Sequence, residues 1–213
     1  MIALIDYGAG NLTSVRKALT SLGADFLVPA SPADIAGARG LIVPGVGHFS
    51  ATTRLDEPWR QAIGDAVRAG TPLLGICVGM QWLFEGSEEA PEVPGLGVLP
   101  GRCRLLRGDA AQRMKIPHVG WNALQPSFAP DRAVASEGTP FPGRLLAGLP
   151  ADPYVYFTHS FAAPVTGDCV AATTHAECFS AVVERGHVFG VQFHPEKSSD
   201  AGLRILRNFL DLC

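Results

Sequence analysis

The central segment of the chain reads Pro72-Leu73-Leu74-Gly75-Ile76-Cys77-Val78-Gly79-Met80-Gln81. A short apolar run enters a cysteine that has a glycine two residues before it and another two residues after it, and a helical pattern follows. This pattern has the form of a nucleophile elbow, a sharp turn from a strand into a helix with the reactive side chain at its tip. Glycines are expected on both sides because the backbone passes close to itself there.

Cys77 is a candidate nucleophile because of where such a turn places its sulfur. The N-terminus of a helix carries the positive end of the helix dipole, which favours the thiolate, and the thiolate is the reactive form of cysteine. The alternative is a packing residue, since free cysteine is among the most buried residue types. A histidine placed to act as a base would favour the catalytic interpretation.

Length, composition and charge limit the class of protein. The chain has 213 residues, of which 47% are hydrophobic and 17% charged, so it is globular and long enough to bury a core. A net charge of −3 gives no electrostatic footprint for nucleic acid. No apolar stretch approaches the length of a membrane span, and the first residues read as a strand rather than a signal peptide. We therefore expect neither nucleic acid nor a membrane as a partner.

The cysteines point to a reducing compartment. They are odd in number, widely spaced and without a Cys-x-x-Cys pair: Cys77, Cys103, Cys169, Cys178 and Cys213. This usage argues against a disulfide framework and against a zinc site. We predict a cytoplasmic protein with no metal and no cofactor.

In the first half of the chain, apolar runs alternate with helical patterns. Strands are expected at Ile2–Asp6, Ala24–Val28, Gly40–Val43 and Leu73–Ile76, and helices at Asn11–Leu22 and Trp59–Ala69. Such alternation predicts a parallel sheet with helices on both faces.

The second half changes to strands separated by turns, followed by one helix. Strands are expected at Arg102–Leu106, Val119–Leu124, Tyr154–Phe157, Cys169–Thr174, Phe179–Glu184 and Val188–Phe193, a loop at Pro126–Pro153 and a closing helix at Asp200–Leu212. These strands predict an antiparallel or mixed extension of the same sheet. With no repeat and no long linker, residues 1–213 are expected to form a single α/β domain with a central, mostly parallel sheet.

A second candidate group lies in Val191-Gln192-Phe193-His194-Pro195-Glu196-Lys197-Ser198. Pro195 biases His194 to an extended backbone, and in an extended segment His194 and Glu196 lie on the same side. The carboxylate can then hold one imidazole nitrogen and leave the other free as a base. Alone, His194 would be read as a half-buried loop histidine. Together with the cysteine elbow, which also falls at the carboxyl end of a predicted strand, it predicts a Cys-His-Glu triad.

A third motif, Pro44-Gly45-Val46-Gly47, follows the predicted strand that ends at Val43. Paired glycines let backbone N–H groups approach a ligand closely. We predict an oxyanion hole formed by the N–H groups of Val46 and Val78, in which one donor stabilises the transition state by roughly 3–4 kcal/mol. The alternative is a simple turn, because Pro-Gly pairs are common in turns.

Together the three motifs resemble the class I, or triad, glutamine amidotransferases, in that family's order and over most of the chain. The resemblance implies that Cys77 attacks the side-chain amide of glutamine. His194 would activate the thiol and then protonate the leaving ammonia, and Glu196 would orient His194. The resemblance further implies that a γ-glutamyl thioester forms and that water then releases glutamate.

Further segments narrow the resemblance within the family. They are Asp6-Tyr7-Gly8-Ala9-Gly10-Asn11-Leu12, Lys115-Ile116-Pro117-His118-Val119-Gly120-Trp121-Asn122, Tyr156-Phe157-Thr158-His159-Ser160-Phe161 and the Pro44–Gly47 motif. They resemble the branch whose members pass ammonia directly to a cyclase in histidine biosynthesis. That likeness implies a heterodimer with a cyclase subunit of (β/α)₈-barrel type. Phe161, where tyrosine is commoner, and His48, where a small residue is commoner, depart from the pattern.

The resemblance also implies roles outside the triad. Residues expected to bind the glutamine substrate are Gly45, Gly47, Gln81, Glu89, His159, Ser160 and Phe161. Residues expected near the partner interface and the ammonia exit are Asn11, Trp121, Tyr156 and Lys197. Ordinary packing remains the alternative for Trp121 and Tyr156, and ordinary exposure for Lys197.

The glycines around Val46 suggest a regulatory switch. The intervening peptide could flip, so that in one state its N–H misses the oxyanion and in the other, favoured by partner and nucleotide, it points at it. Rival functions are a glutaminase serving another synthase, a γ-glutamyl hydrolase, or a non-catalytic glutamine-binding module on the same fold.

Overall fold

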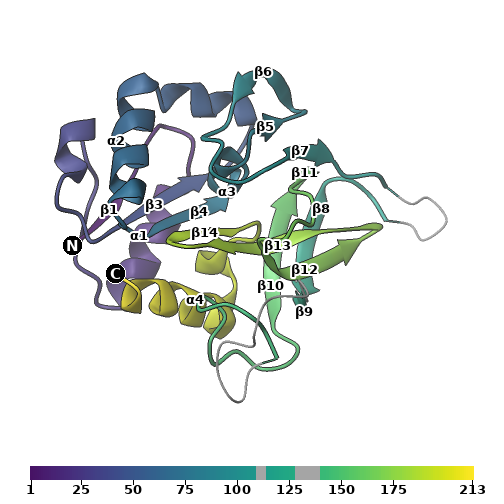
Figure 1. Ribbon diagram of the computed structural model, residues 1–213. Coiled ribbons are helices and arrows are strands. Elements are labelled where there is room, and N and C mark those ends of the chain that lie inside the picture. Colours follow the sequence, from purple (N-terminus) through teal and green to yellow (C-terminus); the bar gives the residue numbers. More distant parts are fainter. Residues whose placement is uncertain (109–113, 128–139) are drawn as a thin grey trace.

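A mixed sheet of eight strands runs through the centre of the molecule, in the order β2-β1-β3-β4-β14-β13-β12-β9 (Figure 1). The computed structural model describes residues 1–108, 114–127 and 140–213. The strands span β1 (Ile2–Leu4), β2 (Phe26–Leu27), β3 (Gly40–Gly45), β4 (Leu73–Cys77), β9 (Gln125–Pro126), β12 (Cys169–His175), β13 (Glu177–Arg185) and β14 (Val188–Val191).

Strand direction divides this sheet into two parts. The strands from β2 to β14 pair in parallel, whereas β14, β13, β12 and β9 pair antiparallel. Every residue of β3, β4 and β14 is buried, as their unbroken apolar runs require of central strands covered on both faces. The predicted parallel sheet with an antiparallel extension is confirmed.

In the described residues, four α-helices cover the sheet: α1 (Leu12–Ser21), α2 (Glu57–Arg68), α3 (Val78–Leu83) and α4 (Ser199–Asp211). Figure 1 shows α2 on one face, and α1 and α4 on the other. The start of α2 lies two residues before the predicted one because the Asp56 side chain caps it, accepting a hydrogen bond from the Trp59 N–H. Within the described ranges, no helix is long and apolar enough to cross a bilayer.

Some predicted strands of the second half lie outside the main sheet. Among the strands that the structure describes, β8 (His118–Ala123) pairs with β10 (Tyr154–His159) alone. Strand β7 (Arg102–Leu105) joins β5 (Gly86–Ser87), β6 (Ala90–Pro94) and β11 (Phe161–Ala162) in a four-stranded sheet. The expectation that these segments extend the main sheet is wrong. Alternating apolar residues identify a strand, but they do not specify the strand with which it pairs.

The predicted loop at Pro126–Pro153 lies partly outside the described residues, which exclude 128–139. The described part from residue 140 onward consists of turns and bends with no long strand or helix. It nevertheless buries Phe141, Leu145 and Leu146 completely in the hydrophobic core. This loop therefore contributes to the core.

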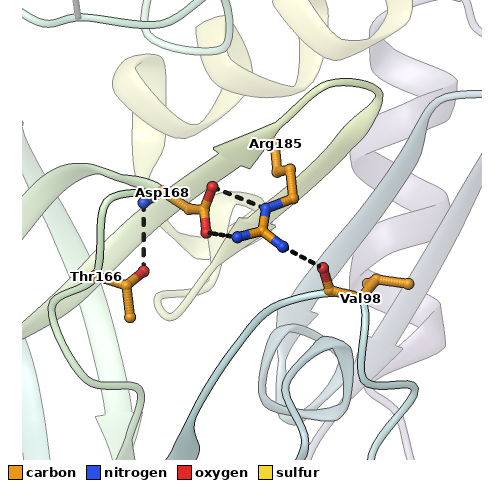
Figure 2. A network of polar contacts seen from close by, with 4 residues as sticks. All are labelled: Val98, Thr166, Asp168 and Arg185. Atoms are coloured by element: carbon orange, nitrogen blue, oxygen red, sulfur yellow. Dashed lines mark hydrogen bonds and ion pairs between the residues drawn. The ribbon is translucent and has the colours of Figure 1, made fainter. Parts of the chain in front are cut away.

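An arginine fork stabilises the end of the antiparallel extension (Figure 2). Arg185 at the end of β13 donates through Nε and Nη2 to the two carboxylate oxygens of Asp168, at 3.0 and 2.7 Å, and through Nη1 to the Val98 carbonyl at 3.1 Å. The Asp168 N–H also donates to Thr166 Oγ1. Since Asp168 is only 8% exposed, its charge depends on this partner.

Histidines fill the space between the β8–β10 pair and the main sheet. His118 stacks on His175 with ring centroids 4.1 Å apart, and its Nδ1 lies 3.1 Å from His159 Nε2. Phe157 and Phe179 pack around these rings. Burial lowers the pKa of His118 to about 4 and that of His159 to about 3, so both imidazoles are neutral in the folded protein.

Replacement of Arg185 by alanine should lower the free energy of unfolding by about 2 kcal/mol, because it leaves the buried Asp168 carboxylate without its charged donor. Urea denaturation measures the loss. The matched control is Arg68→Ala, which breaks an ion pair between Arg68 and Asp65, whose side chains are 71% and 60% exposed. This substitution should lower the free energy of unfolding by less than about 0.5 kcal/mol. Equal losses in the two variants would contradict the role given to the fork.

Acidification should destabilise the protein through the buried histidines. The folded-state pKa of His159 lies below its unfolded value, so as the pH falls the unfolded chain takes up a proton that the folded chain does not. Its share of the fall in unfolding free energy between about pH 7 and about pH 5 is about 2 kcal/mol. Urea denaturation at several pH values should show a shallower fall in His159→Phe. Phe179→Leu, which alters the same cluster without removing a titratable group, should keep the wild-type slope; a wild-type slope in His159→Phe would refute the assignment.

Candidate active site

Cys77 occupies a strained turn between β4 and α3. It is the last residue of β4, α3 begins at Val78, and the backbone φ angle of Cys77 is +53°, a region that residues other than glycine rarely adopt. A Cβ atom on Gly79 would lie 1.8 Å from the Val43 carbonyl oxygen, and one on Gly75 would lie 2.6 Å from the Gly79 oxygen. The predicted sharp turn is present, and both glycines are required by close backbone contacts.

His194 and Glu196 form a buried pair. His194 Nδ1 lies 2.9 Å from Glu196 Oε1, and the two side chains are 2% and 1% exposed. The backbone of His194 is extended as predicted, but Pro195–Lys197 form a 3₁₀ turn rather than a continued extended segment. The proline explains the difference, since its fixed φ suits a first helical turn. The turn brings the carboxylate to the imidazole nevertheless.

The electrostatics of this pair favour a charged imidazole. Burial by itself lowers the pKa of His194, but Cys77 and Glu196 outweigh burial and raise the pKa above its usual range. Within the described residues, His194 Nε2 has no hydrogen-bond partner. One ring nitrogen is thus held by the carboxylate, and the other is unengaged and electrostatically coupled to the sulfur.

A cavity of about 270 Å³ opens beside the sulfur. It is lined by Cys77 and Val78, by both Val46 and Gly47 of the glycine motif, and by residues of the β10–β11 segment. Its size suits a small molecule. Six of the seven residues predicted to bind substrate line the cavity: Gly47, Gln81, Glu89, His159, Ser160 and Phe161.

Gly45 is the exception. It does not line the cavity but pairs with Cys77 across β3 and β4. A Cβ atom there would lie 2.3 Å from the Tyr7 hydroxyl and 2.8 Å from the Gly79 nitrogen. The absence of a side chain at Gly45 therefore lets the glycine motif approach the elbow.

Several polar groups around the cavity are held by other parts of the protein. Glu89 Oε2 accepts a hydrogen bond from the Phe49 N–H at 2.7 Å, and His159 Nδ1 lies 2.9 Å from the Phe161 carbonyl oxygen. Gln81 Nε2 donates to the same carbonyl at 2.8 Å. These contacts fix the shape of the cavity.

The two predicted oxyanion donors are the N–H groups of Val46 and Val78, and that of Val46 already has a hydrogen-bond partner. Val78 lines the cavity directly after the cysteine. The Val46 N–H donates instead to the Ala9 carbonyl at 2.9 Å, and is therefore engaged away from a substrate. Gly47, next to it, has a φ of +86°, which only glycine adopts easily. With this hydrogen bond in place, the predicted Val46 donor is not available to an oxyanion.

Three of the residues expected at a partner surface lie together. Trp121 on β8 is 52% exposed and its ring is 6.1 Å from that of Tyr156 on β10, and Lys197 Nζ lies 5.9 Å from the Tyr156 ring. The main chain of Tyr156 also accepts a hydrogen bond from the His194 N–H at 2.9 Å. Asn11 is at the N-cap of α1, outside this group.

Sequence reasoning missed the roles of two buried residues near the elbow, Gln192 and Tyr7. Gln192 is completely buried with its Nε2 3.8 Å from Cys77 Sγ, a position that strand alternation with His194 could have indicated. Tyr7 is buried beside Gly45 with a hydroxyl that has no partner among the described residues. Burial and the nearby Cys77 raise its pKa. No spacing in the sequence indicates this contact.

Comparisons with known proteins agree with this geometry. The model of the glutamine amidotransferase class-I family matches residues 3–213. The subunit HisH of imidazole glycerol phosphate synthase from Xanthomonas euvesicatoria is 47% identical over 99% of this chain and 97% of its own length. The Deinococcus radiodurans subunit HisH is 43% identical over 98% of this chain and 92% of its own length.

A solved structure described as a glutamine amidotransferase has the same fold. It superposes with a TM-score of 0.73 at 22% identity and covers 100% of this chain and 98% of its own. The range matched by the family model, residues 3–213, spans the elbow, the glycine motif and the His-Glu pair of this chain. The chain belongs to the class I glutamine amidotransferase family.

Proposed function

We propose that this chain is the glutaminase subunit of an imidazole glycerol phosphate synthase. Residues 1–213 act as one domain that hydrolyses glutamine to glutamate and ammonia, and the ammonia passes to a cyclase subunit in histidine biosynthesis. The observation that carries the proposal is the elbow thiol at the wall of a small cavity, electrostatically coupled to His194, which forms a buried pair with Glu196. The likeness to subunit HisH sequences supports the choice of synthase.

The proposed reaction uses Cys77, His194 and Glu196 in distinct roles. The sulfur of Cys77 attacks the amide carbon of glutamine, and His194 transfers a proton to the nitrogen as the carbon–nitrogen bond breaks, which releases ammonia. Water then attacks the γ-glutamyl thioester with His194 as base, and the carbon–sulfur bond breaks to release glutamate. Glu196 holds the imidazole in one orientation throughout, as its 2.9 Å contact allows.

The glycine motif gives the site an off state. With the Val46 N–H on the Ala9 carbonyl, Val78 is the one of the two proposed donors that remains for the oxyanion. Loss of one such donor slows acyl transfer by roughly a hundredfold to a thousandfold. In the proposed active state the Val46 peptide flips toward the substrate, and the cyclase with its nucleotide binds that state more tightly.

The β8–β10 pair is the proposed docking surface for the cyclase. Val119, Trp121 and Tyr154 are 56%, 52% and 58% exposed on this pair, an unusual density of large apolar side chains. Aromatic residues of this kind dominate the binding energy of protein interfaces. A barrel-type cyclase in a heterodimer would cover them and receive ammonia before it becomes non-nucleophilic ammonium in bulk water.

The compartment follows from the same proposal. All five cysteines lie in the described ranges and are free, including the exposed Cys178. Free thiols persist in reducing compartments. We place the enzyme in the cytoplasm.

Replacement of Cys77 by serine should reduce glutamine hydrolysis at least about a thousandfold, because the hydroxyl lacks the reactivity of a thiolate, and should leave folding and partner binding intact. Glutamate release is measured with the chain alone, with the cyclase, and with the cyclase plus its nucleotide. Cys178→Ser, at an exposed cysteine outside the cavity, is the matched control and should retain full activity.

The same assays separate the alternatives. Wild-type turnover that rises strongly only with cyclase and nucleotide fits the switch, whereas full speed of the isolated chain would exclude it. Retained turnover in Cys77→Ser would exclude Cys77 as the nucleophile. Activation by a different synthase instead of the cyclase would identify a sister glutaminase.

Replacement of Trp121 by alanine should weaken binding to the cyclase roughly thirtyfold or more, since it removes a large exposed aromatic from the proposed surface. Isothermal titration calorimetry gives the dissociation constants. The matched control Val165→Ala removes an apolar side chain of similar exposure, 48%, away from β8 and β10, and should leave affinity unchanged. Equal losses would place the interface elsewhere.

A further inference from the structure

We propose that Gln192 is a further catalytic residue of this site: its side-chain amide donates to the Cys77 sulfur and stabilises it as an anion. The inference rests on the proposed function, because it takes Cys77 to be the nucleophile. Gln192 Nε2 lies 3.8 Å from Cys77 Sγ, and Gln192 has no exposed surface.

The fold places Gln192 beside the elbow. In the parallel pairing of β14 with β4, Val191 is opposite Ile76. Gln192 follows Val191 and Cys77 follows Ile76, so Gln192 and Cys77 are neighbours. The Gln192 N–H donates to the Ala181 carbonyl at 2.9 Å, which continues the contact with the adjoining strand. The side chain therefore projects from a backbone that is held on both sides.

A chain of hydrogen bonds determines which end of the amide faces the sulfur. Gln81 Nε2 donates to the Phe161 carbonyl at 2.8 Å, and this carbonyl can only accept. The same nitrogen donates to Gln192 Oε1 at 3.1 Å. With its oxygen turned to Gln81, Gln192 presents its N–H₂ group to Cys77.

This donor differs in kind from His194. The imidazole gives up a proton during the proposed reaction, and its charge then no longer balances the sulfur. A primary amide does not titrate near neutral pH and keeps its N–H throughout the reaction. Gln192 is therefore available both when the thiolate attacks and when the carbon–sulfur bond of the thioester breaks and negative charge returns to the sulfur.

The chain of hydrogen bonds from Phe161 through Gln81 to Gln192 also joins the substrate cavity to the nucleophile. Phe161 and Gln81 both line the cavity, and Gln192 lies behind them against the sulfur. The orientation of the donor therefore depends on the cavity wall.

Two substitutions test the proposal. Gln192→Met removes both amide groups at similar volume. Gln192→Glu keeps an oxygen acceptor for Gln81 but, when ionised, has no donor for the sulfur, so it isolates loss of the donor from loss of the Gln81 contact. The matched control is Gln61→Met, at an exposed glutamine of α2.

The measurement is the rate of alkylation of Cys77 by iodoacetamide as a function of pH, followed by mass spectrometry of the peptide that contains Cys77. We expect the midpoint of thiolate formation to rise by about one pH unit in Gln192→Met, from the usual strength of a hydrogen bond to a charged group. The rise in Gln192→Glu should be at least as large, because a carboxylate repels the thiolate. Gln61→Met should match the wild type.

An unchanged midpoint in folded Gln192→Met would overturn the proposal, as would an unchanged midpoint in folded Gln192→Glu with its carboxyl ionised. Circular dichroism establishes folding, and the near-isosteric glutamate variant decides the matter if the methionine variant does not fold. The alkylation uses neither glutamine nor a cyclase. Failure of the proposed function would appear separately, as a wild-type chain that does not hydrolyse glutamine with the cyclase and nucleotide present.

Discussion

The close approach of α3 to the end of β3 is the constraint on which the rest of the site depends. It brings Gly79 against the Val43 carbonyl and holds Cys77 in a left-handed backbone conformation. A residue other than glycine in such a conformation costs of the order of 1–3 kcal/mol, so it persists only where the surroundings impose it. Here three buried parallel strands and the contacts of Gly45 and Gly75 impose it.

Strand order then assembles a site from distant parts of the sequence. β3, β4 and β14 are neighbours in the sheet, so the glycine motif, the cysteine and the His-Glu segment all emerge at the same carboxyl edge. The register places Gly45 level with Cys77 and the residue after Val191 beside it. No flexible segment is needed to bring these groups together.

The sequence was informative where a local rule applies. The glycine spacing predicted the elbow, apolar runs predicted the central strands, and the position of both motifs at the carboxyl ends of predicted strands predicted that Cys77 and His194 share one edge. Pairing was not predictable in the same way: β8 alternates apolar and polar residues and β10 has apolar residues on both faces, and such patterns fit the main sheet as well as the separate pair that the two strands form. Contacts made across the fold, such as the Tyr7 hydroxyl at Gly45 or Gln81 holding Gln192, have no periodic signature. The 3₁₀ turn after His194 depended on Pro195, whose fixed φ suits a helical turn as well as an extended segment.

Tyr156 has two kinds of contact that are usually far apart in an enzyme. Its ring lies between Trp121 and Lys197 on the outer surface, and its backbone bonds to the His194 N–H and to Ser198 Oγ, which itself donates to the His194 carbonyl. The outer surface and His194 are thus separated by the main chain of a single strand residue. A rigid strand would be enough to couple the two, with no long route of moving side chains between them.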